Sequence, residues 1–294
     1  MSDKPRTTAA DKNLNRRQGL TVFRMELRRI FFGPGFFALL LLAALPIFPF
    51  ALRLVVSLLF PAERAVADTT TVFAAVFQGF ILPMVLFFGC VMIFTGLIRR
   101  EVRERTLHHL FLAPVPRRTI LLGKYAAGVF AGTLVFATST LVAFALAYAP
   151  HLFAPGSSEG GIDGQSFALR TLFLAGPGFG HLLRYLLVIA LGTIGYGAVF
   201  LLFAMFVKNP IVPMFGVLAW ESINAILPVA LKKISVYHYL HGLCPVPVVD
   251  LPFAILAQAP SPWVAIPGLL ALAAVLLWIS TLKFDRMEIQ YGGE

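Results

Sequence analysis

Long apolar runs alternate with short polar segments along most of this chain of 294 residues. Each run is long enough for one helix to cross a hydrocarbon core about 30 Å thick. These runs predict membrane-spanning helices, because a helix satisfies its backbone polar groups within one segment. The six predicted spans cover residues 36–60, 72–98, 125–149, 182–207, 211–231 and 263–282.

The N-terminal region has a different pattern. Residues 1–18 are polar, with five basic residues and two Asp, and predict a disordered tail. Residues 19–35 predict an amphipathic helix that lies in the membrane interface and ends at Gly33-Pro34-Gly35. An ordinary juxtamembrane anchor would show the same pattern. The apolar face of this helix carries Leu20, Phe23, Leu27 and Ile30.

Composition excludes a soluble globular domain, since 59% of the residues are hydrophobic and the mean hydropathy is +0.84. The net charge of +10 lies mostly beside the spans, where anionic lipid and topology account for it, so we expect no nucleic-acid partner. Cys90 falls inside a span and Cys244 in a later loop, which predicts neither a disulfide nor a metal pair.

The distribution of basic residues predicts the orientation. Six spans place both termini on one side, and 18 of the 24 Lys and Arg residues fall on that side. The positive-inside bias therefore predicts that both termini are cytoplasmic. The expected fold is an all-α polytopic membrane protein, in which residues 36–294 form a six-helix transmembrane domain after the interfacial helix.

The most polar internal segment is residues 99–124, which carry seven Lys or Arg residues and two Glu. Within it, Leu107, Leu110 and Phe111 share one face of a short amphipathic helix, and Pro114 and Pro116 end that helix. The positive-inside bias alone explains the charge of such a loop. The order of its residues carries further information.

That order runs Glu101, Glu104, Thr106-Leu107, Pro114-Val115-Pro116-Arg117 and Gly123-Lys124. It resembles the cytoplasmic loop of ABC-2 type transporter permeases. In that family a Glu-x-Gly-Thr-Leu-like element, a Pro-Val-Ser-Arg-like element and a Gly-Lys follow the second span and form the coupling helix that docks on the ATPase. Arg105 stands at the usual Gly position. The resemblance extends over about Leu20 to Glu294, with residues 19–35 as the elbow helix.

The resemblance implies a permease subunit, expected to be an exporter in a bacterial inner membrane. Two copies, or this chain and a paralogous permease, would form one pathway in the lipid bilayer. Separate ATPase subunits would hold ATP and Mg, and accessory proteins are possible partners. The implied ATPase-coupling residues are Glu101, Glu104, Arg105, Leu107, Leu110, Phe111, Pro114 and Arg117.

The sequence contains no ATPase motif of its own. Gly123-Lys124 lacks the Gly five residues earlier that a phosphate-binding loop needs, because Arg118 stands there. We therefore expect no enzymatic activity, and no cofactor or metal bound by this chain. Glu221 and Asn224, at i and i+3 in the predicted fifth span, either line the pathway or a subunit seam, or serve only as hydrogen-bonding groups between helices.

The alternative function is an ATP-independent secondary transporter or channel. That class favours an internal inverted repeat with helices broken at matching positions. The two halves of this sequence show no such repeat. A membrane-embedded enzyme would require a cytoplasmic cluster of acidic or His residues, which the sequence lacks.

The predicted orientation can be tested with single introduced cysteines. A cysteine at Ser157 should react with an impermeant thiol reagent applied from outside the cell, and a cysteine at Thr106 should not. The parent chain, which carries only Cys90 and Cys244, measures the background labelling. Labelling at position 106 but not at 157 would show that the orientation is the reverse.

Overall fold

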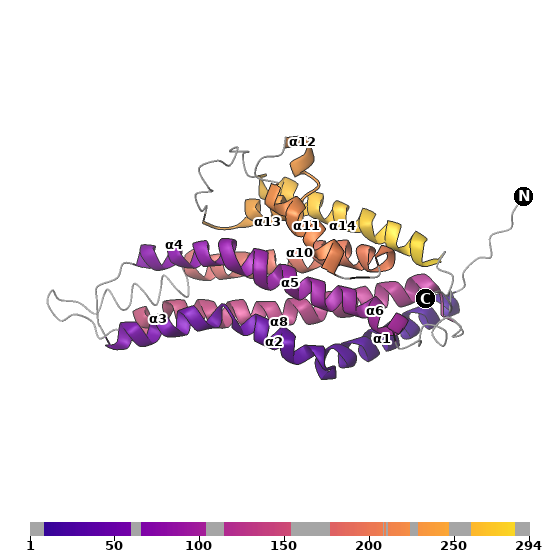
Figure 1. The fold of residues 1–294 in the computed structure, drawn as a ribbon, viewed down its shortest axis with the longest axis horizontal. Helices are drawn as coiled ribbons and strands as arrows, with labels where there is room; N and C mark the ends of the chain where they lie inside the picture. The colour runs from indigo at the N-terminus through magenta and orange to yellow at the C-terminus, as the bar shows by residue number, and fades with distance from the viewer. Residues whose placement is uncertain are drawn as a thin grey trace, which may run out of the picture.

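The computed structural model describes residues 9–59, 66–103, 115–153, 177–207, 209, 211–223, 229–246 and 260–285. Every regular element among these residues is a helix (Figure 1). In chain order the helices are α1 (Ala9–Phe32), α2 (Gly35–Ala44), α3 (Ile47–Leu59), α4 (Val66–Val76), η1 (Phe77–Leu86), α5 (Phe87–Cys90), η2 (Val91–Thr95), α6 (Gly96–Arg103), α8 (Arg117–Phe153), α10 (Pro177–Phe206), α11 (Ile211–Ile223), α12 (Val229–Lys232), α13 (Val236–Leu243) and α14 (Pro262–Asp285).

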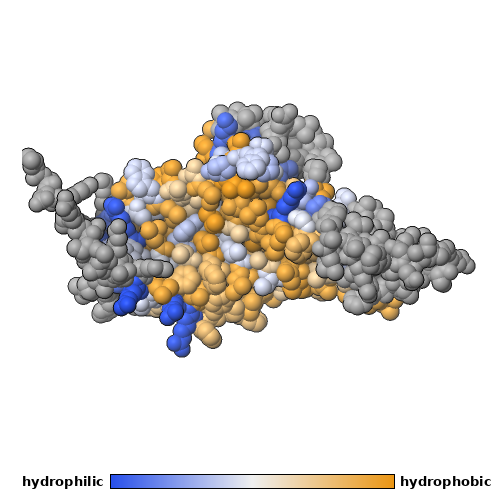
Figure 2. All heavy atoms as spheres, turned by 180° about the vertical axis from the view of Figure 1, so that it is seen from behind, coloured by the Kyte–Doolittle hydropathy of each residue, from blue (hydrophilic) through white to orange (hydrophobic). Residues whose placement is uncertain are grey.

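Five helical segments of the described chain are long and apolar enough to cross a membrane. They are Gly35–Leu59, Thr69–Glu101, Arg117–Ala149, Gly178–Phe206 and Pro262–Asp285. These segments match five of the six predicted spans. On the face shown in Figure 2, apolar side chains form a broad band, and hydrophilic side chains lie at one end of it, with smaller patches at the top and toward the other end. This surface is the one expected of an all-α multi-pass membrane protein.

The predicted fifth span is different. Its helix, α11, has 13 residues and ends at Ile223, and the next described helix, α12, begins at Val229. A helix of 13 residues rises about 20 Å, which is less than the thickness of a hydrocarbon core. Residues 224–228, between these two helices, lie outside the described residues, so the single helix expected over residues 211–231 stays a prediction.

The first span is bent as its prolines predict. Helices α2 and α3 are separated by a turn at Leu45 and Pro46, and together they count as one apolar segment of 25 residues. The break between α1 and α2 falls at Gly33-Pro34, as the sequence also predicts. There the backbone N–H of Phe36 donates to the carbonyl of Gly33.

The N-terminal helix is longer than predicted. Residues 9–18, expected in a disordered tail, are part of α1, because no Gly or Pro interrupts the chain between Ala9 and Gln18. The buried face is also different from the predicted one. Val22, Glu26 and Ile30 are buried, whereas Leu20 is half exposed. Helix α1 packs along α8.

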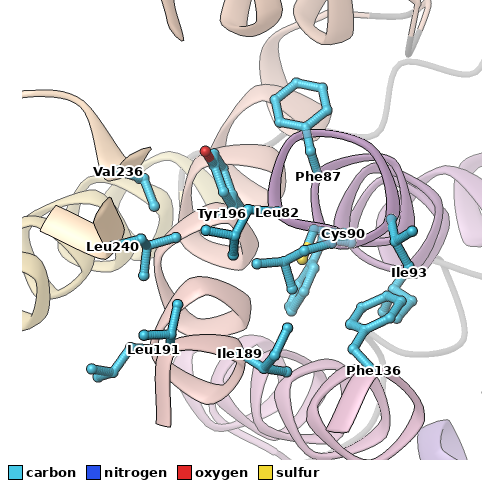
Figure 3. Close-up of a cluster of buried hydrophobic side chains, with 14 of the residues drawn as sticks. Leu82, Phe87, Cys90, Ile93, Phe136, Ile189, Leu191, Tyr196, Val236 and Leu240 are labelled. Carbon is cyan, nitrogen blue, oxygen red and sulfur yellow. The ribbon is translucent and has the colours of Figure 1, made fainter. Parts of the chain in front are cut away.

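The second span lies at the centre of the bundle and is the most buried of the five. Two of its segments, η1 and η2, are π-helical, and η1 contains Pro83. Proline lacks an N–H and clashes with the preceding turn, so a wider helical turn accommodates it. Side chains from this span, α8, α10 and α13 form one continuous core (Figure 3).

Glycines allow the central helices to approach closely. A Cβ atom at Gly128 of α8 would lie 2.8 Å from Phe94, and a Cβ at Gly197 of α10 would lie 2.4 Å from the same ring. Phe94 is fully buried between these two helices. The absence of a side chain at Gly128 thus lets α8 pack closely against the second span.

Adding one methyl group at Gly197 should destabilise the bundle. Gly197→Ala forces Phe94 to move inside a filled core, which costs about 1–3 kcal/mol. Gly216→Ala in α11 is the matched control, because no atom lies within 4 Å of its Cβ position. Thermal unfolding in detergent should give a lower Tm for the first variant only. Equal Tm values would contradict the packing described here.

Candidate functional site

Lys124 is fully buried inside α8, although the sequence places it at the end of a charged loop. Its ammonium group donates to the carboxylates of Glu26 in α1 and Glu101 in α6. The contact to Glu101 Oε1 is 2.5 Å long. The segment predicted as a loop over residues 99–124 is helical at both ends, because α6 runs to Arg103 and α8 starts at Arg117.

A fourth charge completes this group, since Arg29 Nη1 lies 3.6 Å from Glu101 Oε1. We call Glu26, Arg29, Glu101 and Lys124 the ionic cluster. It contains two positive and two negative charges, and both carboxylates and the ammonium are almost completely buried. Removing such charges from water is costly, and only opposite charges in direct contact offset that cost. The cluster is therefore stable only when α1, α6 and α8 are together.

The position of the ionic cluster gives it structural importance. Helix α6 ends and α8 begins at the two sides of residues 104–114, and both helices are joined to α1 by the cluster. Figure 1 shows α1, the end of α6 and the start of α8 at the same end of the bundle. The ionic cluster thus holds the helices on both sides of residues 104–114 against α1.

A second polar contact joins α8 to α14 at the same end. Arg118 Nε donates to the carboxylate of Asp285 over 2.9 Å, and Arg117 Nη1 donates to the Asp285 carbonyl oxygen over 2.8 Å. The start of α8 and the end of α14 therefore lie side by side. The start of α1 is at this end too, so the described parts nearest to both termini share one end of the bundle (Figure 1).

The predicted coupling residues divide into two groups. Glu101 is only 3% exposed, and its carboxylate accepts a hydrogen bond from Lys124. Arg117 is half-buried and binds Asp285. The other predicted coupling residues lie outside the described residues, namely Glu104, Arg105, Leu107, Leu110, Phe111 and Pro114.

Glu221 lies in the last described turn of α11. Its carboxylate accepts a hydrogen bond from Ser235 Oγ, and Ser235 is the N-cap of α13. The buried Tyr196 of α10 approaches the same carboxylate, so the group joins three helices. Asn224, its predicted neighbour on this face, lies outside the described residues.

Arg53 of α3 contacts the second span. Its guanidinium donates to Thr69 Oγ1 over 2.8 Å at the start of the second span. Close to Glu221, His238 of α13 is half-buried, and burial followed by the charge of Lys232 lowers the pKa of this imidazole. The described residues contain no group of three or more His, Cys, Asp and Glu side chains that could hold a metal ion.

The ionic cluster was not predicted from the sequence, although two signals for it exist. Glu26 lies at i+4 from Val22 and i−4 from Ile30, on the buried face of α1. Lys124 is followed directly by an uncharged apolar run, which favours a place inside the helix. Neither signal identifies the partner, because the three helices are far apart in sequence.

The fold and the site define an all-α multi-pass membrane protein with a buried ionic cluster at one end of its bundle. No protein-family model matches this chain, and a search of curated proteins finds no match.

Removing the ammonium group should destabilise the fold strongly. Lys124→Met leaves two buried carboxylates with Arg29 as their only cation within the ionic cluster, a loss expected to cost about 3–5 kcal/mol. The double variant Lys124→Met, Glu26→Gln restores a neutral cluster and should regain part of the Tm lost. Arg118→Met is the control, since the exposed pair with Asp285 contributes about 1 kcal/mol or less. A double variant no more stable than Lys124→Met would refute the charge argument.

Proposed function

We propose that this chain is the membrane-spanning permease subunit of an ABC-2 type ATP-driven transporter. It would work as an exporter and as a dimer, coupled to separate ATPase subunits that hold ATP and Mg. The observation that carries this proposal is the ionic cluster, which ties both helices leading into residues 104–114 to α1. A connection can transmit a displacement only if the helices at both of its ends are held in place.

The proposed mechanism is mechanical. Closure of the ATPase dimer displaces the 104–114 connection, and α6 and α8 move with it because Lys124 joins Glu101 to Glu26. Both helices are continuous with spans at the centre of the bundle, so the displacement reaches the membrane interior. The π-helical segments η1 and η2 supply places where the second span can change its turn without losing packing.

The proposed orientation is a bacterial inner membrane with both termini cytoplasmic. It is supported by the charge bias of the sequence and by the contact of Arg118 with Asp285, which brings the end of α14 next to the start of α8. Docking of the ATPase is assigned to the 104–114 segment, with Glu104, Leu110 and Phe111 as the main contacts. Glu221 is assigned to the pathway or a subunit seam, and its carboxylate accepts a hydrogen bond from Ser235, the N-cap residue of α13.

The docking assignment predicts uncoupling without unfolding. Leu110→Asp with Phe111→Asp, or Glu104→Lys alone, should abolish permease-dependent ATP hydrolysis, because an apolar and acidic contact surface is lost. The measurement is ATPase activity and copurification of the complex with its ATP-binding subunit after reconstitution in nanodiscs. Arg24→Gln, an exposed change at the same end of the bundle, is the control.

Two results would contradict the proposal. The first is that the docking variants support ATP hydrolysis and copurify with the ATPase subunit as the parent chain does. The second is that the parent chain catalyses substrate flux in liposomes with no ATPase present. The second result would favour the ATP-independent carrier or channel.

A further inference from the structure

A recess opens between the N-terminal helices and the second span. It is lined by α1, α2, η2 and α6, and its empty space, including the mouth, is about 460 Å³. One end of the lining is charged and carries Glu26, Arg29 and Arg100. The other end is apolar and carries Phe36, Leu39, Met92, Ile93 and Leu97.

The charged end has one cation available for a ligand. Glu26 is bound to Lys124, and Arg29 lies 3.6 Å from Glu101. Arg100 is different, because among the described residues its guanidinium forms no hydrogen bond or ion pair. The recess therefore carries an uncompensated positive charge beside an apolar surface.

The turn between α1 and α2 is shaped around this guanidinium. A Cβ atom at Gly33 would lie 2.9 Å from Arg100 Nη1, and a Cβ at Gly35 would lie 2.7 Å from Nη2. Glycine at both positions lets the guanidinium lie directly on the turn. Arg100 is thus held at the charged end of the recess, next to the bend visible below α6 in Figure 1.

The surroundings identify the class of ligand. The recess is open, and the apolar residues next to it on α1 and α2 are strongly exposed, with Phe32 at 86% and Phe37 at 77%. Such a surface faces lipid chains in a protein of this class. A ligand that fits must have an anionic head for Arg100 and an apolar body for Phe36 and Leu39, which a free phosphate ion lacks.

We propose that the recess binds an anionic phospholipid, with its phosphate on the Arg100 guanidinium and an acyl chain along Phe36, Leu39 and Met92. The bound lipid bridges the N-terminal helices to the second span beside the ionic cluster. The site is independent of the proposed transport function, since it requires only the described helices and a membrane.

Binding can be measured on the full chain, purified and delipidated in detergent, by thermal shift and native mass spectrometry. The probes are short-chain phosphatidylglycerol, phosphatidylcholine with the same chains, and inorganic phosphate. Phosphatidylglycerol should raise the Tm and be retained, and the other two should have little effect. A basic residue next to an anionic lipid accounts for roughly fivefold in affinity, so Arg100→Gln should weaken phosphatidylglycerol by about that factor.

Two further variants separate this site from general surface charge. Gly96→Leu places a side chain in the recess without changing any charge, since only Arg100 approaches its Cβ position, at 3.6 Å. It should weaken phosphatidylglycerol as Arg100→Gln does. Arg24→Gln removes an exposed charge outside the recess and should bind as the parent chain does.

The proposal is overturned if Arg100→Gln and Gly96→Leu both retain the parent preference for phosphatidylglycerol. It is also overturned if inorganic phosphate alone reproduces the shift, or if Arg24→Gln weakens binding as much as Arg100→Gln does. If Arg100→Gln is poorly folded, loss of phosphatidylglycerol binding in Gly96→Leu with a normal Tm still supports the proposal.

Discussion

The burial of Lys124 is the constraint on which this end of the molecule depends. An ammonium group removed from water requires opposite charge in direct contact, and the two carboxylates that supply it belong to different helices. Glu26 and Glu101 in turn cannot be buried without a cation beside them. Each of the three helices can therefore bury its charged side chain only when the other two are present. The arrangement of α1, α6 and α8 follows from this mutual requirement.

The same constraint explains the course of the N-terminal helix. Helix α1 turns Val22 and Glu26 toward α8, where Val22 lies beside Gly123 and Glu26 binds Lys124. The carboxylate of Glu26 has its partner there, which decides the rotation of the helix. Leu20 is left half exposed as a consequence.

The centre of the bundle is organised by shape. Phe94 of the second span occupies space that Gly128 and Gly197 leave open. In a membrane the hydrophobic effect does not drive helices together, so close packing at small residues must supply the attraction. The second span can contain both a rigid ionic contact and adaptable turns because they lie in different segments. The ionic contact is in α6 at one end of the span, and the π-helical turns are in η1 and η2.

The sequence by itself determined the helical class, five of the spans, the breaks at Pro46 and at Gly33-Pro34, and the location of the most charged connection. Each of these depends on local signals, namely runs of apolar residues, prolines and charge. It did not determine that Lys124 and Glu101 are buried together, or that Glu221 accepts a hydrogen bond from the N-cap residue of α13. Only the tertiary structure decided these, because a charged residue has the same local signature in a solvated loop and in a buried pair. The difference is its partner, and the partner comes from a distant part of the chain.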